Sequence, residues 1–114
     1  MPSPPSTPDR PVLVVDVRKD TDGAVIVSAD GEIDLETSPE LGRALDDALA
    51  ATARVVVDLR SVTFMDSTGI SLLLTTAEQA RRASVELSIE PSAVVRRVLR
   101  LTGVEHVLPL ARLA

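Results

Sequence analysis

Apolar and polar positions change period several times along this chain, and each change predicts an element of structure. Short runs rich in valine and isoleucine predict strands, whereas apolar residues recurring every three or four positions predict helices. The expected strands are residues 12–17, 24–29, 54–59 and 85–89, with a short edge strand at 107–110 around Pro109. The expected helices begin near Ser38, Thr68 and Ser92.

The start of the first expected helix carries two overlapping signals. Thr37 and Glu40 have the spacing of a capping box, while Ser38 before Pro39 is an N-cap followed by proline at the first helical position. The preceding segment, Gly31-Glu32-Ile33-Asp34, is expected to lead out of the sheet.

The order of these elements predicts the α/β class. Residues 20–23, Asp-Thr-Asp-Gly, form a typical turn, so the first two strands are expected to pair as a hairpin. Helices then alternate with strands, which predicts a mixed four- to five-stranded sheet. A chain of 114 residues is one domain. We expect residues 1–10, with four prolines, to be a disordered lead-in and residues 11–114 to form the domain.

Composition narrows the possible functions. Hydrophobic residues make up 45% of the chain, but Phe64 is the only aromatic residue, so the expected core is aliphatic. The net charge of −5 and the lack of stacking side chains argue against nucleic-acid binding. There is no cysteine and no apolar run long enough to span a membrane. A cytoplasmic protein that does not associate with membranes is therefore expected.

The most informative stretch is Phe64-Met65-Asp66-Ser67-Thr68-Gly69-Ile70, where the period changes from strand to helix. Asp66 and Ser67 are both good N-caps, and Gly69 is expected to leave the surface around them uncrowded. Ser67 would then lie at the positive end of a helix, where added negative charge is tolerated. Capping alone also explains these residues. No histidine lies near Ser67 and Gly-x-Ser-x-Gly is absent, so Ser67 is expected to receive chemistry and not to act as a hydrolase nucleophile.

This stretch resembles the signature of the STAS domain family, in particular the bacterial anti-sigma factor antagonists. Residues 31–34, 55–59 and 98–103 resemble three further segments of the family, in the same order. The resemblance implies that Ser67 is phosphorylated by a partner that is both anti-sigma factor and serine kinase, and that a serine phosphatase reverses this. It also implies a docking surface comprising Asp34, Asp66, Ser67, Thr68 and Gly69, although Asp34 is equally explained by a turn or cap role.

Other interpretations remain open at this stage. A STAS module could instead scaffold a stress-signalling assembly or serve a lipid-transport complex, with Ser67 only a helix cap. An enzyme or phosphotransfer domain using Asp58 or Asp66 would need a metal or acid–base partner that the sequence does not supply. His106, the only histidine, is expected on the surface, so neither a metal site nor a cofactor is expected. Arginines 96, 97 and 100 are expected to form a solvated helix face.

Overall fold

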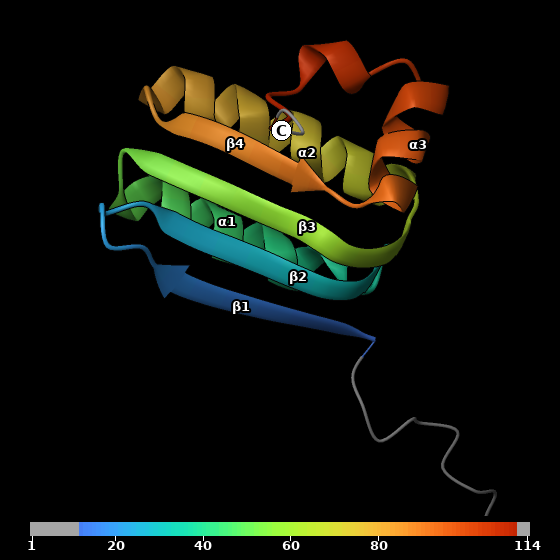
Figure 1. The fold of residues 1–114 in the computed structure, drawn as a ribbon, viewed down its shortest axis with the longest axis horizontal. Helices are drawn as coiled ribbons and strands as arrows, with labels where there is room; N and C mark the ends of the chain where they lie inside the picture. Colours follow the sequence, from blue (N-terminus) through green and yellow to red (C-terminus); the bar gives the residue numbers. More distant parts are fainter. Residues whose placement is uncertain (1–11, 112–114) are drawn as a thin grey trace, which may run out of the picture.

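The computed structural model describes residues 12–111, which form a four-stranded sheet with two helices on one face (Figure 1). The strands are β1 (Leu13–Lys19), β2 (Val25–Ile33), β3 (Arg54–Met65) and β4 (Glu86–Pro91); the helices are α1 (Ser38–Ala51), α2 (Ser67–Ala83), α3 (Ala93–Leu101) and the 3-10 helix η1 (Glu105–Val107). The spatial order of the strands follows the sequence. The α/β prediction is thus confirmed. The lead-in expected at residues 1–10 lies outside the described residues.

The sheet is mixed, as expected. β1 and β2 pair antiparallel as a hairpin, with Leu13 opposite Gly31 and Lys19 opposite Val25. β2, β3 and β4 are parallel, and α1 and α2 make the connections between them. In such a sheet the carboxyl ends of neighbouring parallel strands meet at one edge, which is where ligands and partners usually bind.

The prediction that Gly31–Asp34 leads out of the sheet was wrong for its first three residues. β2 continues to Ile33, and two register shifts against β3 fall between Ser28 and Asp30 and between Gly31 and Glu32. Gly31 has a φ of +125°, and a Cβ there would lie only 2.0 Å from the Val12 carbonyl oxygen. The glycine therefore permits an irregular strand to pass close to β1, and does not end the strand.

The core lies between the sheet and the helices α1 and α2, which share one face (Figure 1). α1 contributes its predicted apolar stripe, with Leu41, Leu45 and Ala48 buried. Alternate residues of β3, such as Val55 and Val57, point into the same layer and have no exposed surface. Burying each such side chain contributes about 1.5–3 kcal/mol, so this aliphatic layer stabilises the packing of α1 and α2 on the sheet.

The capping-box prediction for α1 was wrong. Thr37 is the N-cap, but its side chain makes no capping bond to the helix. The Thr37 hydroxyl instead donates to the Glu32 carbonyl oxygen at 2.8 Å and accepts from the Asp34 N–H at 2.9 Å. Thr37 therefore fastens the turn between β2 and α1.

The C-terminal part agrees with expectation at α3 and differs from it after the helix. Ser92 caps α3 by accepting from the Val95 N–H at 3.1 Å, and Gly103 takes the expected left-handed conformation after the helix. Residues 107–110 do not form an edge strand: η1 occupies Glu105–Val107, and Leu110 makes only an isolated bridge to Ile89. Proline cannot donate a ladder hydrogen bond, which limits pairing here. The sheet consequently has four strands.

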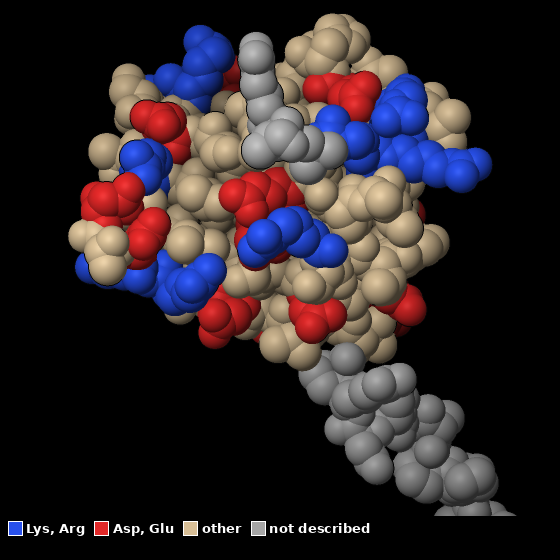
Figure 2. Space-filling view, viewed as in Figure 1, with Lys and Arg blue, Asp and Glu red and all other residues tan. Residues whose placement is uncertain are grey.

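Figure 2 views the sheet from the side opposite α1 and α2 and shows acidic and basic side chains scattered among uncharged residues. Within residues 12–111, no helix has the length and apolar character needed to cross a membrane.

Candidate functional site

The β3–α2 junction lies where the sequence places it. β3 ends at the buried Met65, Asp66 is the N-cap, and Ser67 is the first residue of α2. The Asp66 N–H donates to the Ile33 carbonyl oxygen at 3.2 Å, which joins the ends of β2 and β3. One residue therefore separates the central strand from the helix, and its backbone is held by the neighbouring strand.

Asp66 shapes the first turn of α2. Its Oδ1 accepts from the Thr68 N–H at 2.9 Å and from the Thr68 hydroxyl at 2.5 Å. The hydrogen bond from the Thr68 hydroxyl, followed by backbone bonds, lowers the pKa of Asp66 below its usual value. Asp66 is thus ionised at neutral pH, and this bond ties the half-buried Thr68 side chain to Asp66.

Ser67 is exposed at the start of α2. Its hydroxyl makes no hydrogen bond to any residue among 12–111, while the neighbouring Thr68 hydroxyl is fully engaged with Asp66. The first turn of α2 contains no acidic residue, and the carboxylate at this helix end is that of the N-cap Asp66. A modifying enzyme can reach the Ser67 hydroxyl without unfolding the junction.

Gly69 does not have the surface role expected of it. It is buried, and a Cβ at this position would lie 2.6 Å from Met65 Cγ and 3.0 Å from Ile33 Cγ2. The glycine lets the first turn of α2 pack tightly against the ends of β2 and β3. It therefore positions Ser67 and Thr68, and it offers no surface of its own for a partner to contact.

Asp34 lies in the turn after β2, next to the junction because β2 and β3 are adjacent parallel strands. Its Oδ1 accepts from the N–H groups of Glu36 and Thr37, each at 3.0 Å. These bonds give Asp34 the turn role that the sequence left open. The structure brings Asp34 and Asp66 to one edge of the sheet, together with Ser67 and Thr68.

Two apolar residues at this edge were missed as site candidates. Leu35, in the turn after β2, is 73% exposed, and Phe64, near the end of β3, is 46% exposed. Exposed large apolar side chains beside a polar site commonly mark a docking surface. The sequence offered a signal for each of these exposed residues. Leu35 lies between two acidic residues, and Phe64 is the only aromatic residue of the chain.

The same edge is acidic. Residues 32–40 contain four acidic residues and residues 61–77 contain Asp66, while neither segment contains lysine or arginine. A negative group added at Ser67 would therefore find no cation in either of these two segments; the third segment at this edge, α3 after the end of β4, carries Arg96 and Arg97.

The remaining candidates do not join the junction. Asp58 pairs with Arg60 through both carboxylate oxygens at 3.0 Å, and the hydrogen bond from Arg60 lowers its pKa. Asp58 lies mid-strand, about 25 Å from Asp66 at the usual rise per residue, so the two carboxylates form no common site. His106 is exposed in η1.

The expected arginine face of α3 is only partly solvated. Arg97 and Arg100 are exposed, but Arg96 is half-buried and pairs with Glu105 at 3.3 Å. Among residues 12–111 there is no group of three or more histidine, cysteine, aspartate or glutamate side chains that could hold a metal ion.

Known proteins resemble this chain over nearly its whole length. The family model for the STAS domain matches residues 16–112. The anti-sigma-F factor antagonist RsfB of Mycobacterium tuberculosis is 30% identical over 106 residues, which cover 92% of this chain and 84% of RsfB. The crystal structure of an anti-sigma factor antagonist from Mycobacterium paratuberculosis is 32% identical, with a TM-score of 0.79, and the match covers 95% of this chain and 91% of that one. The phosphorylated form of the Bacillus cell fate determinant SpoIIAA, 20% identical with a TM-score of 0.67 over 87% of this chain and 92% of that one, shares the fold.

Proposed function

The chain belongs to the STAS domain family, and from this membership we propose that it is an anti-sigma factor antagonist controlled by phosphorylation of Ser67. In its unphosphorylated form it binds a cognate anti-sigma factor in the cytoplasm and so releases a sigma factor. That partner, acting as a serine kinase, transfers the γ-phosphoryl group of its ATP to the Ser67 oxygen and retains ADP. A serine phosphatase restores the binding form. The chain itself acts by binding and not by catalysis.

The observation that carries this proposal is the exposed hydroxyl of Ser67 on the first turn of α2, which has no hydrogen-bond partner among residues 12–111. A phosphoryl group adds about −1.5 to −2 charges at pH 7. At a helix N-terminus that charge interacts favourably with the positive end of the helix dipole, so the fold tolerates the modification. The chemical change is therefore expected to act on binding, with the fold left intact.

The switch is expected to work through the surroundings of Ser67. A partner that docks over Leu35 and Phe64 would cover the phosphoryl group and remove much of its water. Neither residues 32–40 nor residues 61–77 offer a lysine or arginine in compensation, and the ionised Asp66 adds repulsion. A cost of about 3–4 kcal/mol would weaken binding several-hundredfold, enough to convert a tight complex into a transient one.

The proposal is tested with the kinase-like anti-sigma factor of the same organism. Incubation with ATP should add one phosphoryl group to the wild-type chain and none to Ser67→Ala, as measured by intact mass. In calorimetry, Ser67→Asp should bind the anti-sigma factor much more weakly than wild type. Ser71→Asp is the matched control, because Ser71 is also exposed and lies one helical turn further along α2. Phosphorylation elsewhere, or equal binding by Ser67→Asp and wild type, would overturn the proposal.

A further inference from the structure

β1 lies at the side of the sheet, and in the described part of the chain it pairs with β2 alone. Its exposed residues include two valines, Val14 and Val17. The Val12 carbonyl oxygen accepts from the Glu32 N–H at 2.9 Å, so the even-numbered residues direct their backbone groups at β2. The N–H and C=O groups of Val15 and Val17 consequently point outward, where the described part of the chain supplies no strand to receive them.

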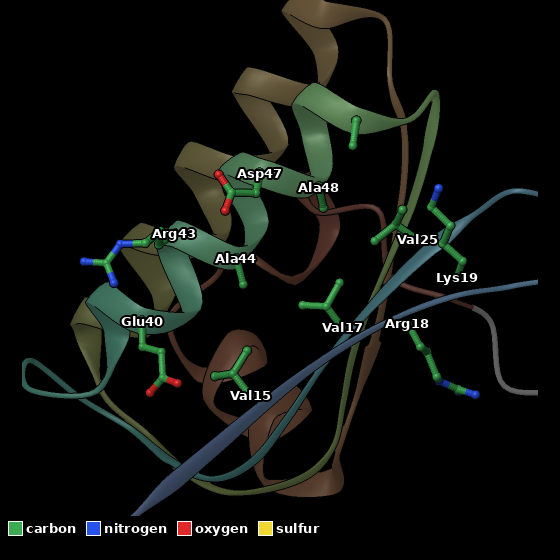
Figure 3. A pocket seen from close by; sticks show the side chains of 11 residues that line it. Val15, Val17, Arg18, Lys19, Val25, Glu40, Arg43, Ala44, Asp47 and Ala48 are labelled. Atoms are coloured by element: carbon green, nitrogen blue, oxygen red, sulfur yellow. The ribbon is translucent and has the colours of Figure 1, made fainter.

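A groove of about 560 Å³ lies beside this edge of the sheet, between β1 and α1 (Figure 3). Its floor is apolar and its rim is charged. Val17 lines it and is 53% exposed although it lies in the middle of a strand. Glu40 and Val15 lie at one end of the groove, and Lys19 and Val25 lie at the other (Figure 3). An unpaired strand edge beside an exposed apolar groove suits a partner that adds a strand.

The charges on β1 favour one arrangement with a second copy. Antiparallel pairing about a two-fold axis at Asp16 would place Asp16 directly opposite its own copy, which is repulsive. Pairing about Val17 places Asp16 opposite Arg18 of the second copy, twice by symmetry. Val17 then packs against its own copy, and Lys19 of the second copy comes opposite Val15, at the end of the groove where Glu40 lies.

We propose that the protein self-associates through β1, as an antiparallel two-fold dimer centred on Val17. The outward N–H and C=O groups of Val17 pair with those of the second copy, and the two sheets become one sheet of eight strands. Charged residues at a strand edge usually prevent such pairing. Here their order along β1 makes them complementary in this register. The Ser67 site is at the ends of β2 and β3, so it stays open in the dimer, which presents two such sites.

The interface is short, so the dimer is expected to be weak, with a dissociation constant of about 10–100 µM. Sedimentation velocity on the full chain, from about 5 to 500 µM, brackets that range. Wild type should pass from monomer to dimer as its concentration rises. Asp16→Arg and Arg18→Asp should each raise the dissociation constant about tenfold, because each places like charges opposite one another twice. Far-UV circular dichroism confirms that each variant is folded.

Two further samples make the test specific to this register. The double variant Asp16→Arg/Arg18→Asp should dimerise as wild type does. An equimolar mixture of the two single variants should form a mixed dimer, because both facing charged pairs are then opposite in sign. A wild-type chain that remains monomeric throughout would overturn the proposal. So would folded single variants that dimerise as well as wild type, or a mixture that fails to pair.

Discussion

Replacing Gly69 by alanine tests how tightly α2 is held against the sheet at the junction. The added Cβ would lie 2.6 Å from Met65 Cγ and 3.0 Å from Ile33 Cγ2. Carbon atoms in favourable contact are about 3.5–4.0 Å apart. Met65 Cγ is close to the backbone and cannot move away as the end of a flexible side chain can. The first turn of α2 or the Met65 rotamer must therefore shift.

The expected magnitude follows from two opposing effects. Overpacking a well-packed core costs about 1–3 kcal/mol, and the position of Cγ places this contact in the upper half of that range. Alanine in place of glycine favours the helix by about 1 kcal/mol. The net expectation is a loss of about 1–2 kcal/mol in the free energy of unfolding.

Gly42 provides the matched control. It is also helical, and its added Cβ would meet only the flexible end of Leu72, Cδ1, at 3.3 Å. Gly42→Ala should therefore retain most of the helix preference and stabilise the protein by about 0.5–1 kcal/mol. The two substitutions are chemically identical, so their opposite signs isolate the packing at Gly69.

Urea unfolding followed by far-UV circular dichroism measures both variants, since the chain has no tryptophan or tyrosine to serve as a fluorescence probe. The contact with Met65 is isolated by repeating Gly69→Ala in a Met65→Ala background, where the penalty should largely disappear. The packing argument fails if Gly69→Ala is as stable as wild type. It also fails if the full penalty persists without the Met65 side chain.

Three further predictions concern stability. Ser92→Ala removes both the α3 cap and the 2.8 Å hydrogen bond to the Val62 carbonyl oxygen. The free energy of unfolding, measured with urea, should therefore fall by about 1–2 kcal/mol, and an unchanged midpoint would contradict this. Ser84 follows α2 with a φ of 57°, a left-handed conformation that is strained for a residue with a side chain. Ser84→Gly should therefore raise stability by about 1 kcal/mol in the same assay, whereas a loss would show that the side chain matters more than the strain. Arg60 lowers the folded-state pKa of Asp58 from 3.8, so this contribution is complete above about pH 4 and is lost as the pH falls through the lowered value. Asp58→Asn should therefore lose less stability than wild type between neutral and acid pH, and an identical pH dependence would refute the assignment.

The sequence predicted the junction well because its signals there are local. Three local features carry the prediction: the strand pattern before Ser67, the capping aspartate, and the helical spacing that starts at Ile70. Each depends on residues that are close to Ser67 in the sequence. The hairpin and the three helices were predictable for the same reason.

Two of the errors concern which neighbours surround a glycine. Gly69 was expected to leave the surface around it uncrowded, and the segment that begins at Gly31 was expected to lead out of the sheet. Each glycine instead makes room for a neighbouring segment: Met65 and Ile33 at Gly69, and the Val12 carbonyl oxygen at Gly31. Glycine can end an element or permit close packing, and only the three-dimensional neighbours decide which.

The single residue between β3 and α2 limits how any event at Ser67 can be transmitted. No hinge or long loop separates the two elements, and the Asp66 amide is tied to the neighbouring strand. On the proposed function, a phosphoryl group at Ser67 would therefore change the charge of this surface with no hinge between β3 and α2 to move. The lifetime of that change would be set by the kinase and the phosphatase.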